Sequence, residues 1–199
     1  MPHRVTELHC IMPIANVPSV MKSGILSYEQ ATKLAHHSVA MTEIQDRRDK
    51  VQVPGGLRLH QYANLYFHAR NPMMFKRKDQ AGHLCVLRVS RDVFTMNGVV
   101  LADQNASSGY VRFLSPPQIR LIDFDLVYAD DWRHPNDSIA YYRHKAAMCA
   151  EVLVPKAVPS GLIVGAYVPS KQAAHTLAAT GFNQAIQVNA HLFFSVSEQ

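Results

Sequence analysis

Short apolar runs bounded by Pro, Gly and polar residues dominate the second half of the sequence. Four of them are typical of strands, because each is short and is flanked by residues that interrupt regular structure: 65–68, 84–89, 151–154 and 162–168. Many short strands with few long helices favour an α+β fold over a doubly wound parallel sheet. The sequence contains neither GxGxxG nor GxxxxGKS/T, which counts against a Rossmann domain and a P-loop.

Spacing and end signals predict three helices and two further strands. Residues 16–23 form a predicted short helix that Gly24 ends. Residues 170–180 form another, with Ser170 as the N-cap and Gly181 after its end. The longest helical pattern is 28–50, and its apolar stripe consists of Ala31, Leu34, Ala35, Ala40, Met41 and Ile44. Residues 4–12 and 185–195 are predicted strands.

The length of 199 residues and the absence of repeats or linkers predict one domain over 1–199. No apolar stretch approaches the roughly 20 residues of a membrane helix, and the first residues have no apolar run typical of a signal peptide. The cysteines, Cys10, Cys85 and Cys149, are far apart and form no CxxC pair, so we expect neither disulfides nor a metal site. These features favour a cytoplasmic protein.

Positive charge is concentrated in the middle of the chain. Between Arg47 and Arg91 ten Lys or Arg residues face only Asp49 and Asp79, an excess of eight positive charges, whereas the net charge of the whole chain is +5. A basic segment of this kind attracts polyanions such as nucleic acid. A solvated basic surface without a partner explains it equally well.

Four sequence features are candidates for chemistry, and each also has an ordinary structural explanation. His9 lies in the predicted first strand, where a satisfied core histidine is common. Arg47 and Arg48 end the long helix, where they either complement its dipole or bind phosphates. The aromatic stretch 62–75 is explained by packing alone. Glu151 opens an apolar run, where a carboxylate either lies at a solvated strand end or stabilises a developing cation.

Together these residues resemble the DarT family of DNA ADP-ribosyltransferase toxins of toxin–antitoxin systems. The similar segments occur in the family's order over residues 8 to about 160, and they are LH at 8–9, QDRRD at 45–49, HQYANLYFHARNPMMF at 60–75, DQNASSGYVRF at 103–113 and KAAMCAEVLVPKAVP at 145–159. The resemblance implies the ADP-ribosyltransferase (ART, PARP-like) fold, a split antiparallel sheet flanked by helices, which agrees with the strand-rich pattern.

The resemblance also implies roles for single residues. Glu151 matches the catalytic glutamate, and Arg48 matches an arginine that contacts NAD and is proposed to accept a proton. Residues from about 36 to 53 match the NAD-binding helix, and those from about 104 to 150 match the segment that selects the acceptor. The further NAD-binding residues are expected to be His9, Cys10, Ile11, Ser19 and Ser27, and the DNA-contacting residues Arg47, His60, Tyr62 and Arg70. Trp132 is added to the DNA-contacting residues from its position, because the aromatics Tyr128, Trp132, Tyr141 and Tyr142 precede Glu151, where a ring either stacks on a base or packs in the core.

The function that this resemblance implies is transfer of ADP-ribose from the co-substrate NAD to thymine or guanine in single-stranded DNA, with release of nicotinamide and without a metal. A neutralising antitoxin of the macrodomain type, or a related ADP-ribosyl hydrolase, is an expected partner. Ile11, Asn64 and Asn71 depart from the family's usual Thr, Pro and Ser. An ADP-ribosyltransferase of RNA or protein, or a non-catalytic nucleic-acid-binding module, remains the alternative.

Overall fold

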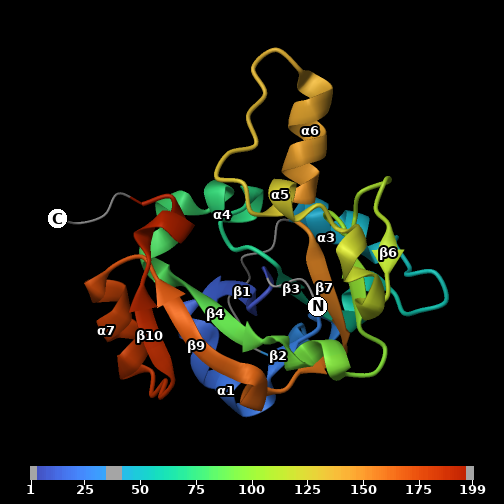
Figure 1. The fold of residues 1–199 in the computed structure, drawn as a ribbon. Coiled ribbons are helices and arrows are strands. Elements are labelled where there is room, and N and C mark those ends of the chain that lie inside the picture. Colours follow the sequence, from blue (N-terminus) through green and yellow to red (C-terminus); the bar gives the residue numbers. More distant parts are fainter. Residues whose placement is uncertain (1–3, 35–41, 196–199) are drawn as a thin grey trace.

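The computed structural model describes residues 4–34 and 42–195, which form a mixed α+β structure, as expected (Figure 1). Among these residues eight strands make one sheet in the order β10-β9-β4-β1-β3-β7-β5-β6. Their bounds are β1 Glu7–Pro13, β3 Tyr62–Tyr66, β4 Leu84–Ser90, β5 Val100–Ala102, β6 Phe113–Leu114, β7 Glu151–Pro155, β9 Ile163–Val168 and β10 Ala185–Val188. The short strands β2 (Ile25–Leu26) and β8 (Ala157–Val158) pair separately.

The α-helices in the described residues are short, and several connections contain 3₁₀ turns. They are α1 Val17–Ser23, α2 Tyr28–Ala31, α3 Thr42–Asp49, α4 Pro72–Lys76, α5 Phe124–Val127, α6 Ser138–Ala147 and α7 Lys171–Ala179. Helix α6 projects away from the sheet together with the loop that precedes it (Figure 1). No helix in the described part of the chain is both long and apolar enough to cross a membrane.

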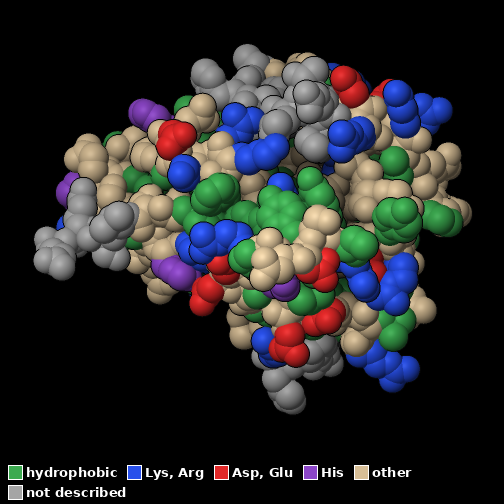
Figure 2. All heavy atoms as spheres, turned by 90° about the horizontal axis from the view of Figure 1, so that it is seen from above, with side chains coloured by type: hydrophobic (Ala, Val, Ile, Leu, Met, Phe, Trp, Pro, Cys, Tyr) green, Lys and Arg blue, Asp and Glu red, His purple; other side chains and the backbone are tan. Residues whose placement is uncertain are grey.

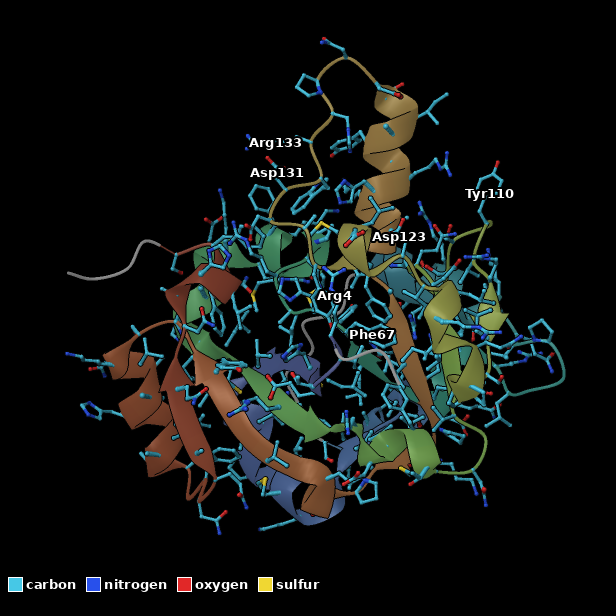
Figure 3. All side chains as sticks on the ribbon, in the orientation of Figure 1. Arg4, Phe67, Tyr110, Asp123, Asp131 and Arg133 are labelled. Atoms are coloured by element: carbon cyan, nitrogen blue, oxygen red, sulfur yellow. The ribbon has the colours of Figure 1, made fainter. Side chains whose placement is uncertain are left out.

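The main core fills the space between the central strands and the segments that cover them. Alternation along β1 and β4 places Leu8, Leu87 and Val89 in this core, where all three are fully buried. Phe67, which follows β3, stacks against Phe94 and meets Phe124 edge to face (Figure 3). Packing therefore holds the central strands of the sheet in place.

The sheet opens between β1 and β3. Strand β1 is paired with β4 along seven residues, from Glu7 opposite Ser90 to Pro13 opposite Leu84. Its pairing with β3 consists of one residue pair, His9 opposite Tyr66. Strand β3 instead pairs along its whole length with β7, which ends with Tyr66 opposite Glu151. The two halves of the sheet thus diverge beside Tyr66 and Glu151.

One strand pair corrects the expectation of an antiparallel sheet. Strand β10 runs parallel to β9, with Ala185 opposite Gly165 and Val188 opposite Val168. The reason is the intervening helix α7, because a crossover helix returns the chain to the same end of the sheet. Ser170 caps α7 as expected, and its side chain accepts a hydrogen bond from the Ala173 amide at 3.2 Å.

Three predicted elements differ from the structure. The strand predicted over 65–68 is β3, which runs over Tyr62–Tyr66. The single helix over 28–50 is wrong, because α2 ends at Ala31 and α3 begins at Thr42; the stripe residues Ala35, Ala40 and Met41 lie outside the described residues. The strand over 185–195 is too long. It ends at Val188 because Asn189 caps a 3₁₀ turn by accepting a hydrogen bond from the Leu192 amide.

Candidate active site

A cavity of about 460 Å³ lies where β1 and β3 diverge. Its walls come from β1, α1, α3, β3, α4 and the end of α6, so segments far apart in the sequence meet around it. A concave site of this size takes a small-molecule ligand. Glu151 and Arg48 both lie in its lining.

Glu151 is the most buried charged side chain of the site, with 1% of its surface exposed. Arg48 Nη1 donates hydrogen bonds to both of its carboxylate oxygens, at 2.9 and 3.2 Å, and the Ala106 amide donates to Oε1 at 3.0 Å. A buried carboxylate is costly unless it is paired and hydrogen-bonded. These donors meet that requirement and leave an anion fixed in the cavity.

Two polar atoms of α3 have no hydrogen-bond partner in the described part of the chain. They are Nη2 of Arg48, a donor, and Oε1 of Gln45, an acceptor, and both are buried. The two residues line the cavity one helical turn apart. Unsatisfied buried polar atoms are rare and call for an explanation. A ligand that offers one acceptor and one donor would satisfy both.

Three ionisable groups near Glu151 in the cavity have raised pKa values. Burial, reinforced by the Glu151 carboxylate opposite, raises the pKa of Tyr66 well above its ordinary value. Burial raises the pKa of Cys10 and of Cys149 to about 12, so both are thiols rather than thiolates at neutral pH. Glu151 is thus the anion available for chemistry. The described residues contain no cluster of His, Cys, Asp or Glu suited to a metal ion.

The residues expected to bind NAD divide into two groups. Cys10, Ile11 and Ser19 line the cavity together with Arg48. Ser27 is buried at the start of α2, where its amide donates to the Lys156 carbonyl at 2.7 Å, and it does not line the cavity. Asn64 and Ile11, where the sequence departs from the family's usual residues, both belong to the lining.

His9 lies in a separate polar network on the sheet and is not part of the cavity lining. Its Nδ1 faces the Phe67 carbonyl and its Nε2 faces Glu7 Oε1, each at 3.2 Å. Glu7 also accepts hydrogen bonds from Arg88 at 2.7 Å and Tyr167 at 2.8 Å. Burial alone would raise the pKa of Glu7, but the hydrogen bonds from His9, Arg88 and Tyr167 lower it to about 2.

The five residues expected to contact DNA lie in different environments. Arg47 is exposed on α3, next to Arg48. His60 packs on Tyr28, and its Nδ1 is 3.3 Å from Asp49. The other three are already engaged within the fold.

Tyr62 is 3% exposed, and its hydroxyl accepts a hydrogen bond from the Leu57 amide. Trp132 is buried edge-on against Phe75 and Phe194, and the Arg70 guanidinium lies over the Phe194 ring. The structure therefore places Tyr62 and Trp132 in packing clusters rather than on the surface.

Three further lining residues carry groups suited to a nucleic acid: Lys76 of α4, and Tyr142 and Lys145 of α6. Tyr142 is 68% exposed, so its ring faces solvent at the edge of the cavity. Figure 2 views the molecule from the end where α6 projects, and it shows Lys and Arg side chains beside a central group of hydrophobic side chains. Tyr110, on the loop between β5 and β6, points outward into solvent (Figure 3). The signal available in the sequence was the spacing of three residues between Tyr142 and Lys145, which places both on the same face of a helix.

Comparisons with known proteins agree with this geometry. A DNA ADP-ribosyl transferase–glycohydrolase fusion protein of Thermosipho africanus is 28% identical in an alignment of 196 residues that covers 93% of this chain and 48% of that protein. Its structure with ADP-ribose superposes with a TM-score of 0.84 at 26% identity, over 96% of this chain and 51% of that one. This chain therefore spans about half the length of the fusion protein.

A second relative, a DNA ADP-ribosyl transferase of Thermus sp. 2.9, is 27% identical in an alignment of 171 residues that covers 79% of this chain and 78% of that protein. Its structure with ADP-ribosylated single-stranded DNA gives a TM-score of 0.82 at 22% identity, over 95% of this chain and 96% of that one. Its structure with NAD⁺ gives a TM-score of 0.78 at 21% identity, over 95% of this chain and 98% of that one.

The family model described as "ssDNA thymidine ADP-ribosyltransferase, DarT" matches residues 9–194, a span that contains the whole cavity lining. With nearly its full length matched by that model, the chain belongs to the DarT family.

Proposed function

We propose that this chain transfers ADP-ribose from NAD to a thymine base of single-stranded DNA and releases nicotinamide. The observation that carries the proposal is the buried Glu151 carboxylate, fixed by Arg48 and the Ala106 amide in a cavity of about 460 Å³. The relatives' complexes with NAD⁺, ADP-ribose and ADP-ribosylated DNA support this choice of substrates.

Breaking the bond between nicotinamide and ribose leaves positive charge on the ribose, while the bonding electron pair departs with nicotinamide. The Glu151 anion stabilises that charge, because it is already oriented and excluded from water, where its field is strong. The unpaired Nη2 of Arg48 and Oε1 of Gln45 hold polar groups of the substrates.

A thymine nitrogen then bonds to the ribose carbon and loses its proton. We assign the acceptance of that proton to the Glu151–Arg48 pair. Within the pair the carboxylate is the acceptor and the guanidinium remains charged, because a protonated guanidinium has no acceptor site.

The acceptor strand is proposed to reach the cavity along its rim at α6. An unpaired base can be presented to the site without being pulled from a duplex. Tyr142 offers an exposed ring for stacking, while Lys76, Lys145 and Arg47 offer positive charge for the phosphates. Tyr62 and Trp132 support this region through packing rather than through contact with DNA.

Two wider features are part of the proposal. The opening between β1 and β3 corresponds to the split of the ART fold, and the chain forms one transferase domain. A DNA ADP-ribosyl glycohydrolase, which is fused to the transferase in the Thermosipho relative, is the partner that would reverse the modification as an antitoxin.

The proposal is tested with purified protein, NAD and four separate acceptors: a thymine-rich DNA strand, a thymine-free DNA strand, RNA and a mixed protein extract. Nicotinamide release and acceptor labelling are followed together. We expect labelling of the thymine-rich DNA strand alone, and we expect the Glu151→Gln protein to give no labelling. Labelling of RNA or protein instead of DNA would contradict the proposed acceptor.

A further inference from the structure

One of the donors on Glu151 comes from a loop rather than from a helix or strand. The Ala106 amide, which donates to Oε1 at 3.0 Å, lies in the segment between β5 and β6. A backbone amide has no side-chain rotamers of its own, so its direction depends on what fixes the loop. The contacts of the preceding residue, Asn105, supply that constraint.

Asn105 is anchored on two sides. Its side-chain Oδ1 accepts hydrogen bonds from the Ser107 amide at 2.9 Å and from the Ser107 hydroxyl at 2.7 Å. Its own amide donates to the Ala146 carbonyl, at the end of α6, at 3.1 Å. The side chain thus bridges over Ala106, and the Ala106 N–H is left free to point at Glu151.

The base of the same loop is closed by a second contact. Arg112 donates from its backbone amide and from Nε to the two carboxylate oxygens of Asp103, at 2.9 and 2.6 Å, and from Nη2 to the Leu121 carbonyl at 3.1 Å. The ends of the loop are therefore fixed independently of Asn105. Loss of the Asn105 side chain would loosen the turn around Ala106, which would then keep only the backbone hydrogen bond from the Ser108 amide to the Asn105 carbonyl at 2.9 Å, and the loop would not detach.

We infer that Asn105 is a positioning residue for the transfer reaction, which aims the Ala106 amide at Glu151 and so fixes the carboxylate against the substrate. The inference rests on the function proposed above. Asn105 lines the same cavity as Glu151, so the loop that carries it borders the reacting groups.

The other groups around Glu151 do not supply this constraint. Arg48 reaches the carboxylate through a long side chain and bonds both oxygens through one nitrogen, so it can follow a rotating carboxylate. Tyr66 lies opposite on β3 and Cys149 precedes on the chain, and both face Glu151 as neutral groups. The rigid backbone donor is what distinguishes one carboxylate orientation from another.

The test uses Asn105→Ala, Asn105→Ser and, as a matched control, Asn189→Ala. Ser can form the same turn more weakly. Asn189 likewise caps a turn, through the Leu192 amide, but it is not part of the cavity lining. Steady-state transfer to a thymine-rich DNA strand gives kcat and KM for NAD, and the Ala106 amide proton is followed by NMR in ¹⁵N-labelled protein.

We expect Asn105→Ala to lower kcat roughly 10- to 100-fold, the effect of one hydrogen bond to a charged group, with KM for NAD within about twofold. Asn105→Ser should recover part of kcat, and Asn189→Ala should match wild type. The Ala106 amide proton should lose its downfield, carboxylate-bonded shift in Asn105→Ala and regain part of it in Asn105→Ser.

Unchanged kcat in Asn105→Ala, or an unchanged Ala106 shift there, would overturn the inference. So would an equally inactive Asn105→Ser that keeps the wild-type Ala106 shift, because the side chain would then act on the substrate directly. Inactivity of the wild-type protein would refute the proposed function alone, since the amide shift tests the positioning without activity.

Discussion

Arg48→Met is the substitution whose consequence follows most directly from the structure. Methionine keeps much of the arginine's volume, so packing is largely retained, but Glu151 loses the guanidinium that bonds both of its oxygens at 2.9 and 3.2 Å. With Glu151 only 1% exposed, water cannot replace that partner. Removing one member of a buried ion pair costs about 3–5 kcal/mol, and the remaining Ala106 donor favours the lower end.

A loss of about 3 kcal/mol corresponds to a fall in Tm of roughly 6–12 °C for a domain of this size. Replacing both charges, in Arg48→Met with Glu151→Gln, should restore most of the stability, because no unpaired buried charge remains. Thermal and urea unfolding of wild type, both single variants and the double variant would measure the coupling.

The control is Arg133→Met. Arg133 pairs with Asp131 on the loop before α6, where both side chains are largely exposed (Figure 3), so its loss should leave Tm unchanged. A stable Arg48→Met protein, or a double variant no more stable than Arg48→Met, would refute the reasoning about the buried pair.

Three further predictions concern groups around the site. Glu7→Gln should remove a stabilisation of roughly 3 kcal/mol that follows from the lowering of the Glu7 pKa from 4.5 to about 2. Because the folded-state pKa is the lower one, this stabilisation is present above pH 4.5 and is lost as the pH falls toward 2, so the Tm gap to wild type should close over that range; a constant gap would contradict it. Gln45→Met should stabilise the ligand-free protein by about 1 kcal/mol by removing an unsatisfied acceptor, and should reduce the rise in Tm that NAD produces; an unchanged NAD effect in thermal scans would show that Gln45 binds nothing. Tyr142→Ala should weaken binding of single-stranded DNA about fivefold or more, the loss of one stacked base, while Ile139→Ala on the same helix, exposed but outside the cavity lining, should bind like wild type in fluorescence anisotropy.

Local patterns predict several strands and two of the helices of this protein to within one residue at each end. The apolar runs that became β4, β7 and β9 lie close to their predicted bounds, because strand cores are continuous in sequence and end at breakers. The prediction of one helix over 28–50 was wrong, because the spacing of apolar residues does not show whether other segments of the fold will cover the apolar face. Leu34 remains 43% exposed, and Tyr28 packs on His60 instead of on the main core.

The ion pair between Arg48 and Glu151 cannot be predicted from local sequence patterns. Arg48 and Glu151 are separated by 103 residues, and their contact depends on the opening between β1 and β3. The family resemblance named both residues, but the roles of Ala106 and Asn105 come from backbone geometry, which leaves almost no trace in residue type. Tyr62 and Trp132, both expected to contact DNA, are buried by three-dimensional packing, and their burial could not be predicted from the sequence pattern.

The most direct test of the central claim is the intact mass of a single-stranded oligonucleotide with one thymine after incubation with the protein and NAD. The account predicts a gain of one ADP-ribose, located on the thymine by fragmentation and absent with folded Glu151→Gln protein. An unmodified oligonucleotide under conditions in which NAD is consumed, or equal modification by Glu151→Gln, would contradict it.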